Sequence, residues 1–130
     1  MKSVLIIDDN QDFADSLALL LRLNGHDTSV AYDPTAGVRV AQRTCPDIIV
    51  LDIGLPAISG YEVARKLRRN SAFEKTVLVA VTGLATDEHR QRAYASGFDL
   101  HCTKPLDTGD LRTILQYARA DSSKPVTRRD

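Results

Sequence analysis

Apolar residues occur in two patterns along the chain, as short continuous runs and at helical spacing. The two patterns alternate, and each occurs five times. Short runs of Val, Ile and Leu, of which residues 48–51 are the clearest, predict fully buried strands. The segments between them carry apolar residues at helical spacing, as at Phe13, Leu17 and Leu21. The expected strands cover roughly residues 3–8, 27–32, 47–52, 76–82 and 98–102, and the expected helices roughly residues 11–24, 34–44, 60–70, 86–96 and 107–119.

This alternation predicts the fold class. Strands that alternate with helices of this length form βαβ units around a parallel sheet. Right-handed crossovers and the usual doubly wound topology give the strand order 2-1-3-4-5. The second and fifth expected strands are less apolar than the other three, which suits the two edges of the sheet. We therefore expect an α/β protein with a doubly wound (βα)5 fold and a five-stranded parallel sheet.

Residues with known capping preferences stand at the expected helix ends. The candidate N-caps are Asn10, Asp33, Ser59 (with Glu62 as a capping box), Thr86 and Asp107, and the candidate C-terminal glycines are Gly25 and Gly97. The fourth helix has few apolar anchors, so we expect it to be the least firmly held.

Composition and charge narrow the classes of partner. At 130 residues the chain is long enough for one domain with its own core. Its 17 basic and 17 acidic residues are mixed along the sequence, which favours neither nucleic acid nor a membrane surface as a partner. No apolar run approaches the roughly 18 residues of a membrane span, and no signal peptide precedes the first strand. A cytoplasmic location is expected.

The sequence also predicts the state of the two cysteines and of the C-terminal residues. Cys45 and Cys102 lie far apart and match no metal-binding spacing, so we predict that both are reduced thiols in the core. Residues 121–130 are mostly Ser, Lys, Pro, Thr and Arg and have little to bury. They are predicted to form a flexible C-terminal tail behind a domain of residues 1–120.

Polar side chains with complementary chemistry follow the strands, where the carboxyl ends of a parallel sheet bind ligands. Asp8, Asp9 and Asp52 follow the first and third strands, and three neighbouring carboxylates favour a hard divalent cation such as Mg2+. An aspartate can also act as a nucleophile toward phosphorus. Thr82 and Lys104, after the fourth and fifth strands, offer the hydroxyl and ammonium groups that phosphoryl oxygens require.

Taken together, these motifs resemble the response-regulator receiver domain of two-component signalling, a flavodoxin-like fold. The resemblance covers about residues 3–119 and rests on the acidic pair, Asp-x-x-x-Pro at 52–56, Thr82 and Lys104-Pro105. The stretch 52–64 is similar to receivers attached to hybrid histidine kinases. Since only the ten residues 121–130 follow the expected domain, we expect either a single-domain regulator or a receiver cut from a larger kinase.

The resemblance implies a phosphoacceptor and a metal site. Asp52 would accept a phosphoryl group from a histidine kinase or a histidine phosphotransfer protein. Asp9, Asp52 and the backbone carbonyl of Gly54 would bind Mg2+ directly, and Asp8 would hold a metal-bound water. The protein would be no enzyme for an external substrate, because it would catalyse only its own phosphorylation and dephosphorylation.

It also implies a switch. Lys104 would pair with Asp52 and then with the phosphoryl group, its bond to Pro105 would be cis, and Thr82 would turn its hydroxyl toward the phosphoryl oxygen. The family usually has Tyr or Phe three residues before the lysine, whereas this chain has His101. Two interpretations of His101 stay open: a switch residue that is smaller and more polar than the family norm and sensitive to pH, or a half-exposed residue of an edge strand. An unidentified downstream protein would bind around residues 86–119.

Three other functions fit the sequence less well. A Mg2+-dependent phosphatase with an aspartyl nucleophile needs a second Asp two residues later, where this chain has Gly54. An FMN carrier needs a phosphate loop after the first strand, and Asp8 and Asp9 would repel a phosphate there. A degenerate receiver that acts only as a docking module would not need the intact set of acidic, hydroxyl and lysine residues.

Overall fold

The computed structural model describes residues 2–55, 58–83 and 86–120 of the 130-residue chain. The strands are β1 (Ser3–Ile7), β2 (Asp27–Ala31), β3 (Ile48–Asp52), β4 (Val77–Thr82) and β5 (Leu100–Thr103). The helices are α1 (Gln11–Leu23), α2 (Pro34–Thr44), α3 (Gly60–Arg68), α4 (Asp87–Ala95) and α5 (Thr108–Ala120), with a short 3-10 helix η1 (Ser71–Phe73) after α3. The expected tail, residues 121–130, lies outside the described residues.

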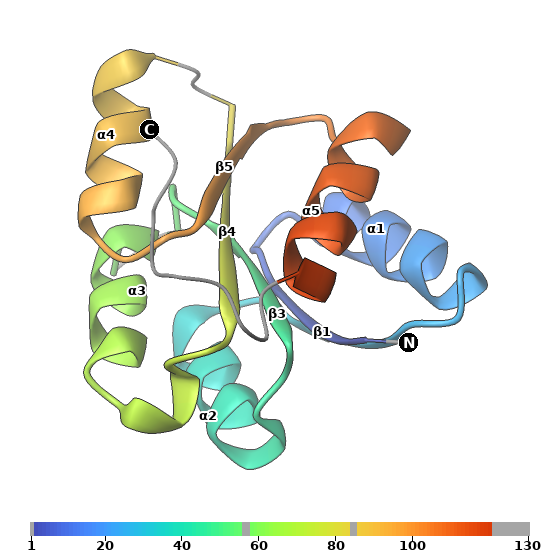
Figure 1. Cartoon of the computed structure of the whole chain (residues 1–130), viewed down its shortest axis with the longest axis horizontal. Helices are drawn as coiled ribbons and strands as arrows, with labels where there is room; N and C mark the ends of the chain where they lie inside the picture. Colours follow the sequence, from blue (N-terminus) through green and yellow to red (C-terminus); the bar gives the residue numbers. More distant parts are fainter. Residues whose placement is uncertain (1, 56–57, 84–85, 121–130) are drawn as a thin grey trace.

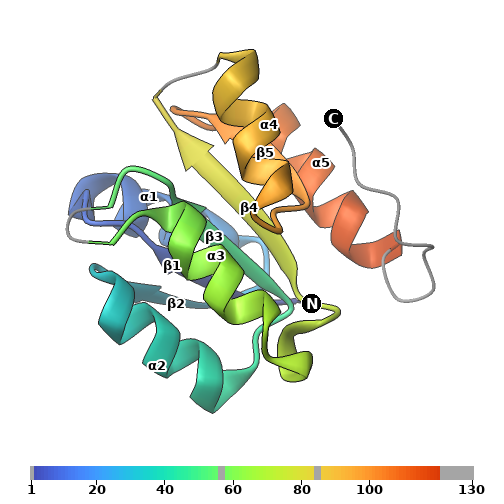
Figure 2. The same cartoon turned by 90° about the vertical axis from the view of Figure 1, so that its left-hand side faces the viewer.

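The five strands form one parallel sheet in the order β2-β1-β3-β4-β5, which confirms the predicted fold. Helices α1 and α5 cover one face of the sheet, and α2, α3 and α4 cover the other (Figures 1 and 2). Strands β1 and β3 lie side by side in the centre, with Ile7 level with Leu51. The carboxyl ends of β1 and β3 therefore meet at one edge of the sheet.

The central strands are buried on both faces because successive side chains point to opposite sides. Leu5 and Ile49 belong to the core beneath α2, α3 and α4, whereas Ile6 and Ile48 belong to the core beneath α1 and α5. All four are completely buried, and burying a side chain of this size contributes roughly 1.5–3 kcal/mol. This rigid double core supports the loops at the sheet edge.

The helix ends follow the capping chemistry that the sequence predicted. Asn10 accepts a hydrogen bond from the Phe13 N–H at 3.1 Å, at the start of α1. At the start of α5, Asp107 accepts from the Asp110 N–H at 2.7 Å, and Asp110 in turn accepts from the Asp107 N–H at 3.0 Å. Gly25 follows α1 with φ of 86°, a left-handed conformation that glycine adopts without strain.

The structure differs from the prediction at Cys45, which is exposed rather than in the core. This residue ends α2 in a left-handed conformation with φ of 47°, which turns the chain away from the helix before β3. Cys102 is half-buried, and burial raises the pKa of its thiol to about 11. Both cysteines are free thiols, as expected.

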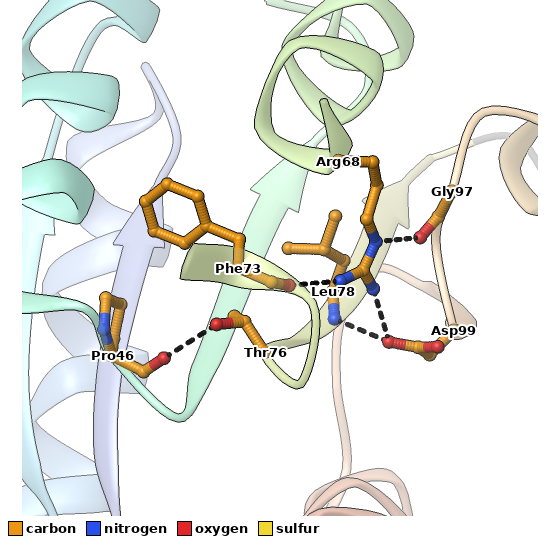
Figure 3. A network of polar contacts seen from close by, with 7 residues as sticks. All are labelled: Pro46, Arg68, Phe73, Thr76, Leu78, Gly97 and Asp99. Atoms are coloured by element: carbon orange, nitrogen blue, oxygen red, sulfur yellow. Dashed lines mark hydrogen bonds and ion pairs between the residues drawn. The ribbon is translucent and has the colours of Figure 1, made fainter. Parts of the chain in front are cut away.

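A buried ion pair joins several segments near the amino ends of β4 and β5 (Figure 3). A nitrogen of Arg68 lies 2.8 Å from Asp99 Oδ2, and the same oxygen accepts the N–H of Leu78 at 3.0 Å. Arg68 also donates to the carbonyls of Phe73 at 2.7 Å and Gly97 at 2.9 Å. The pair thus connects α3, η1 and β4 to the turn that follows α4. Sequence patterns predicted neither this pair nor η1.

No helix within the described part of the chain combines the length and the apolar character that a bilayer crossing requires.

Candidate functional site

Three aspartates converge at the carboxyl ends of β1 and β3, as the predicted topology requires. Asp8 and Asp9 follow β1, Asp52 ends β3, and one carboxylate oxygen of each lies within 4.8 Å of the others. Asp8 and Asp52 are only 1% and 9% exposed, whereas Asp9 is exposed to solvent. The cluster therefore combines two buried carboxylates, Asp8 and Asp52, with the solvent-exposed carboxylate of Asp9.

Each of the two buried carboxylates has one oxygen held by the backbone and the other directed toward Lys104. The N–H of Asn10 donates to Asp8 Oδ1, and the N–H of Gly54 donates to Asp52 Oδ1, both at 2.9 Å. Lys104 Nζ lies 2.8 Å from Asp8 Oδ2 and 3.6 Å from Asp52 Oδ2. Lys104 thus lies between the two carboxylates. The sequence predicted Asp52 as its partner, but Lys104 lies closer to Asp8.

The ends of β4 and β5 bring Thr82 and Lys104 to the same edge. Thr82 is level with Thr103 in the sheet, and its carbonyl accepts the N–H of Lys104 at 2.9 Å. The Thr82 residue is 7% exposed, and the Lys104–Pro105 bond is cis, as predicted. The ammonium group also lies 4.5 Å from the centre of the Phe13 ring, a cation–π contact that orients it.

The electrostatics of the site raise the pKa of Asp52 above its ordinary value. Burial is the largest cause, and the negative charge of Asp8 adds to it. The hydrogen bond from Gly54 and the charge of Lys104 oppose the shift. Desolvation of Asp52 therefore contributes more to the raised pKa than repulsion by Asp8 does.

His101 lies on β5, level with Ala80 of β4, and is half-buried. Neither ring nitrogen has a hydrogen-bond partner among the described residues, although both nitrogens are buried. Burial lowers the pKa of the imidazole, and the neighbouring Arg90 and His89 of α4 lower it further. A neutral ring is therefore favoured here, and its role as a switch stays a hypothesis.

The donor set fits a hard divalent cation. Three carboxylates against one ammonium group leave two uncompensated negative charges when all are ionised. Oxygen ligands of this kind suit Mg2+, which prefers one or two carboxylates and keeps part of its water shell. The backbone carbonyl of Gly54 stays a predicted ligand. Pro56, the last residue of the Asp-x-x-x-Pro motif, lies outside the described residues.

Comparisons with known sequences point to one family. Residues 4–116 match the model of the response regulator receiver domain. An uncharacterized 14.6 kDa protein of Leptolyngbya boryana is 32% identical over 118 residues, which are 90% of each chain. The sensory transduction protein RegX3 of Mycobacterium tuberculosis is 33% identical over 128 residues, which are 95% of this chain and 55% of RegX3. This chain thus spans only about half the length of RegX3.

Solved structures agree with the sequence matches. The chemotaxis response regulator CheY4 of Vibrio cholerae superposes with a TM-score of 0.84 at 25% identity, over 91% of this chain and 98% of CheY4. A receiver domain of a DNA-binding response regulator from Colwellia psychrerythraea superposes with a TM-score of 0.82 at 29% identity, over 90% of this chain and 98% of that domain.

Proposed function

Because the chain belongs to the response regulator receiver domain family of two-component systems, we propose that Asp52 accepts a phosphoryl group from a histidine kinase or a histidine phosphotransfer protein. The observation that carries this proposal is the convergence of two other aspartates and Lys104 on Asp52. Asp52 is the central residue of the set because it ends the middle strand of the sheet.

The residues of the chain suit nucleophilic attack on phosphorus. An oxygen of Asp52 forms the new bond as the P–N bond to the donor imidazole breaks, and the imidazole, which carries a proton on its other nitrogen, leaves with that electron pair as a neutral ring. The Gly54 N–H holds the other carboxylate oxygen, so that Asp52 Oδ2 is the attacking atom. Lys104, 3.6 Å from that oxygen, is near enough to contact the transferred group, and Thr82 supplies a hydroxyl at the neighbouring strand end.

Asp9 and Asp52, with the backbone carbonyl of Gly54, would hold Mg2+ directly, and Asp8 would hold it through water. When bound, the ion supplies positive charge that offsets the charge on the phosphoryl oxygens. Asp8 is the most buried of the three aspartates and is already paired with Lys104, which suits an indirect role.

Phosphorylation of Asp52 would change a partner-binding face formed by α4, β5 and α5. Within α4, all of whose residues are described, only Ala93 is buried, so displacement of this helix exposes little apolar surface. Thr82 would move toward the phosphoryl group, and His101 could then fill the space that it leaves. The downstream partner would be a protein, because the chain carries no net charge that would attract nucleic acid.

Phosphorylation can be measured directly by intact mass. The protein is incubated with acetyl phosphate and Mg2+, and we expect the mass to increase by one phosphoryl group. Asp52→Asn should stay unmodified, and Asp9→Ala or excess chelator should slow the reaction because a metal ligand or the metal is removed. Asp27→Asn, an exposed aspartate at the opposite edge of the sheet, serves as the matched control and should react like the wild type. Undiminished labelling of Asp52→Asn would remove this residue from the proposed role.

The partner-binding face can be tested separately by NMR. Beryllofluoride, which mimics a phosphoryl group on an aspartate, should shift backbone amide signals in residues 86–119 as well as in the acidic cluster. Shifts confined to the cluster would contradict the proposed face without affecting the proposed phosphoacceptor.

A further inference from the structure

Phe13 makes a contact that its place in the apolar pattern of α1 does not require. Its half-buried ring packs against the core beneath α1 and α5. The face of the same ring meets the ammonium group of Lys104, whose Nζ lies 4.5 Å from the ring centre. An aromatic face attracts a cation electrostatically, and the attraction is stronger where water is partly excluded. The Lys104 side chain is only 21% exposed, so this contact is partly desolvated.

Asn10 fixes both the ring and the carboxylate that hold Lys104 on the side of α1. The N–H of Asn10 donates to Asp8 Oδ1 at 2.9 Å, and the Asn10 side chain accepts from the Phe13 N–H at 3.1 Å. The other oxygen of Asp8 lies 2.8 Å from Lys104 Nζ. The start of α1 therefore places a carboxylate and an aromatic ring at defined positions beside the ammonium group.

The ring differs from the two carboxylates in the movement that it allows. A further carboxylate at this position would hold the cation more strongly and would repel an incoming phosphoryl group. An aromatic face attracts the cation without a hydrogen bond of fixed direction. The ammonium group can therefore turn from Asp8 toward Asp52, whose Oδ2 is 3.6 Å away, while it stays over Phe13.

We propose that Phe13 is a positioning residue for phosphoryl transfer, which holds the Lys104 ammonium group where it meets the phosphoryl oxygens as the bond to Asp52 forms. This inference rests on the function proposed for Asp52 and adds a residue of α1 to it. Phe13 acts on the reaction through Lys104 alone, because its ring has no group that donates to a phosphoryl oxygen. Loss of the ring should slow phosphorylation by the factor that the cation–π contact contributes, about fivefold for a partly desolvated pair.

Removal and replacement of the ring give the first test. Intact mass follows the rate at which acetyl phosphate and Mg2+ add one phosphoryl group to the protein. Phe13→Leu keeps an apolar side chain without a ring, and it should react roughly fivefold more slowly than the wild type. Phe13→Tyr keeps the aromatic face and should react within about twofold of the wild-type rate. Urea unfolding checks that both variants are folded.

Fluorination tests the cation–π contact with little change in shape. Phenylalanine with one, two or three ring fluorines, incorporated at position 13, withdraws electron density from the ring face in steps. The logarithm of the phosphorylation rate should fall in the same steps, which a purely structural role of the ring would not produce. The same substitutions at position 73 are the matched control, because Phe73 is buried in the core on the other face of the sheet. They should leave the rate unchanged.

NMR of the unphosphorylated protein detects the contact itself. The ring current of Phe13 should shift the ε-methylene protons of Lys104 upfield in the wild type and in Phe13→Tyr, and Phe13→Leu should lose this shift. Absence of the shift in the wild type would overturn the role of Phe13, as would a normal wild-type rate that fluorination at position 13 does not lower. A wild type that shows the shift but gains no phosphoryl group would instead overturn the function proposed for Asp52, and the role of Phe13 with it.

Discussion

At the scale of single residues, the position of Lys104 decides how the negative charges of Asp8 and Asp52 are compensated. Its ammonium group lies 2.8 Å from Asp8 Oδ2 and 3.6 Å from Asp52 Oδ2. Asp8 is almost fully buried, so its charge is poorly screened and it attracts the cation more strongly. Lys104 therefore stabilises Asp8 while it stays close enough to Asp52 to reach a group bound there.

We expect Lys104→Met to reduce the free energy of unfolding by about 2 kcal/mol, because it leaves Asp8 buried without its counter-charge. The estimate lies below the full value for a buried pair since the Lys104 side chain is 21% exposed. Urea unfolding in the presence of a chelator measures the change. The double variant Lys104→Met/Asp8→Asn should regain most of the loss, and an unchanged single variant would contradict this account of Lys104.

We expect His101 on β5 to make the free energy of unfolding depend on pH. Because the folded protein lowers the pKa of His101 below its ordinary value of 6.5, the unfolded chain binds a proton first as the pH falls. The contribution of His101 to stability is therefore complete above pH 6.5 and is lost as the pH falls from there through the lower pKa of the folded state. Between about pH 7.5 and about pH 5.5, the wild type should lose more free energy of unfolding than His101→Phe. Equal losses in both proteins, measured by urea unfolding, would show that His101 does not titrate in this way.

At the scale of secondary-structure elements, α4 is held mainly at its C-terminal end. Its described residues bury only Ala93, whereas the turn after it is fixed by the contact between Arg68 and the carbonyl of Gly97. Asp99, two residues further on, is 2% exposed and completes this attachment through its ion pair with Arg68. We therefore expect the start of α4, where the Tyr61 hydroxyl donates to the His89 carbonyl at 3.5 Å, to move more easily than its end.

This attachment predicts different effects for two aspartates that are both paired with arginine. Asp99→Ala should reduce the free energy of unfolding by about 3 kcal/mol, because it leaves the Arg68 guanidinium and the Leu78 N–H without their buried acceptor. Asp87→Ala removes the exposed partner of Arg90 and should reduce it by less than about 1 kcal/mol. Similar losses for both variants in urea unfolding would contradict the importance of the buried pair.

At the scale of the whole molecule, the sequence predicted the fold and the members of the site because both depend on local patterns. Buried strands and capped helices specify a doubly wound sheet, and that topology brings Asp8 and Asp52 to one edge. Lys104 lies closer to Asp8 than to Asp52 because the two side chains differ in burial. No sequence pattern encodes that difference. The pair of Arg68 and Asp99, separated by 31 residues, and the exposure of Cys45 follow from tertiary packing in the same way.

The central claim is that Asp52 is the phosphoacceptor, and locating the phosphoryl group on the chain tests it most directly. After incubation with acetyl phosphate and Mg2+, borohydride reduces an aspartyl phosphate to homoserine, and peptide mass spectrometry identifies the altered residue. We predict homoserine at position 52, dependent on Mg2+, with Asp8 and Asp9 unchanged. Homoserine at position 8 or 9, or an unmodified Asp52 in protein that has gained a phosphoryl group, would contradict the claim.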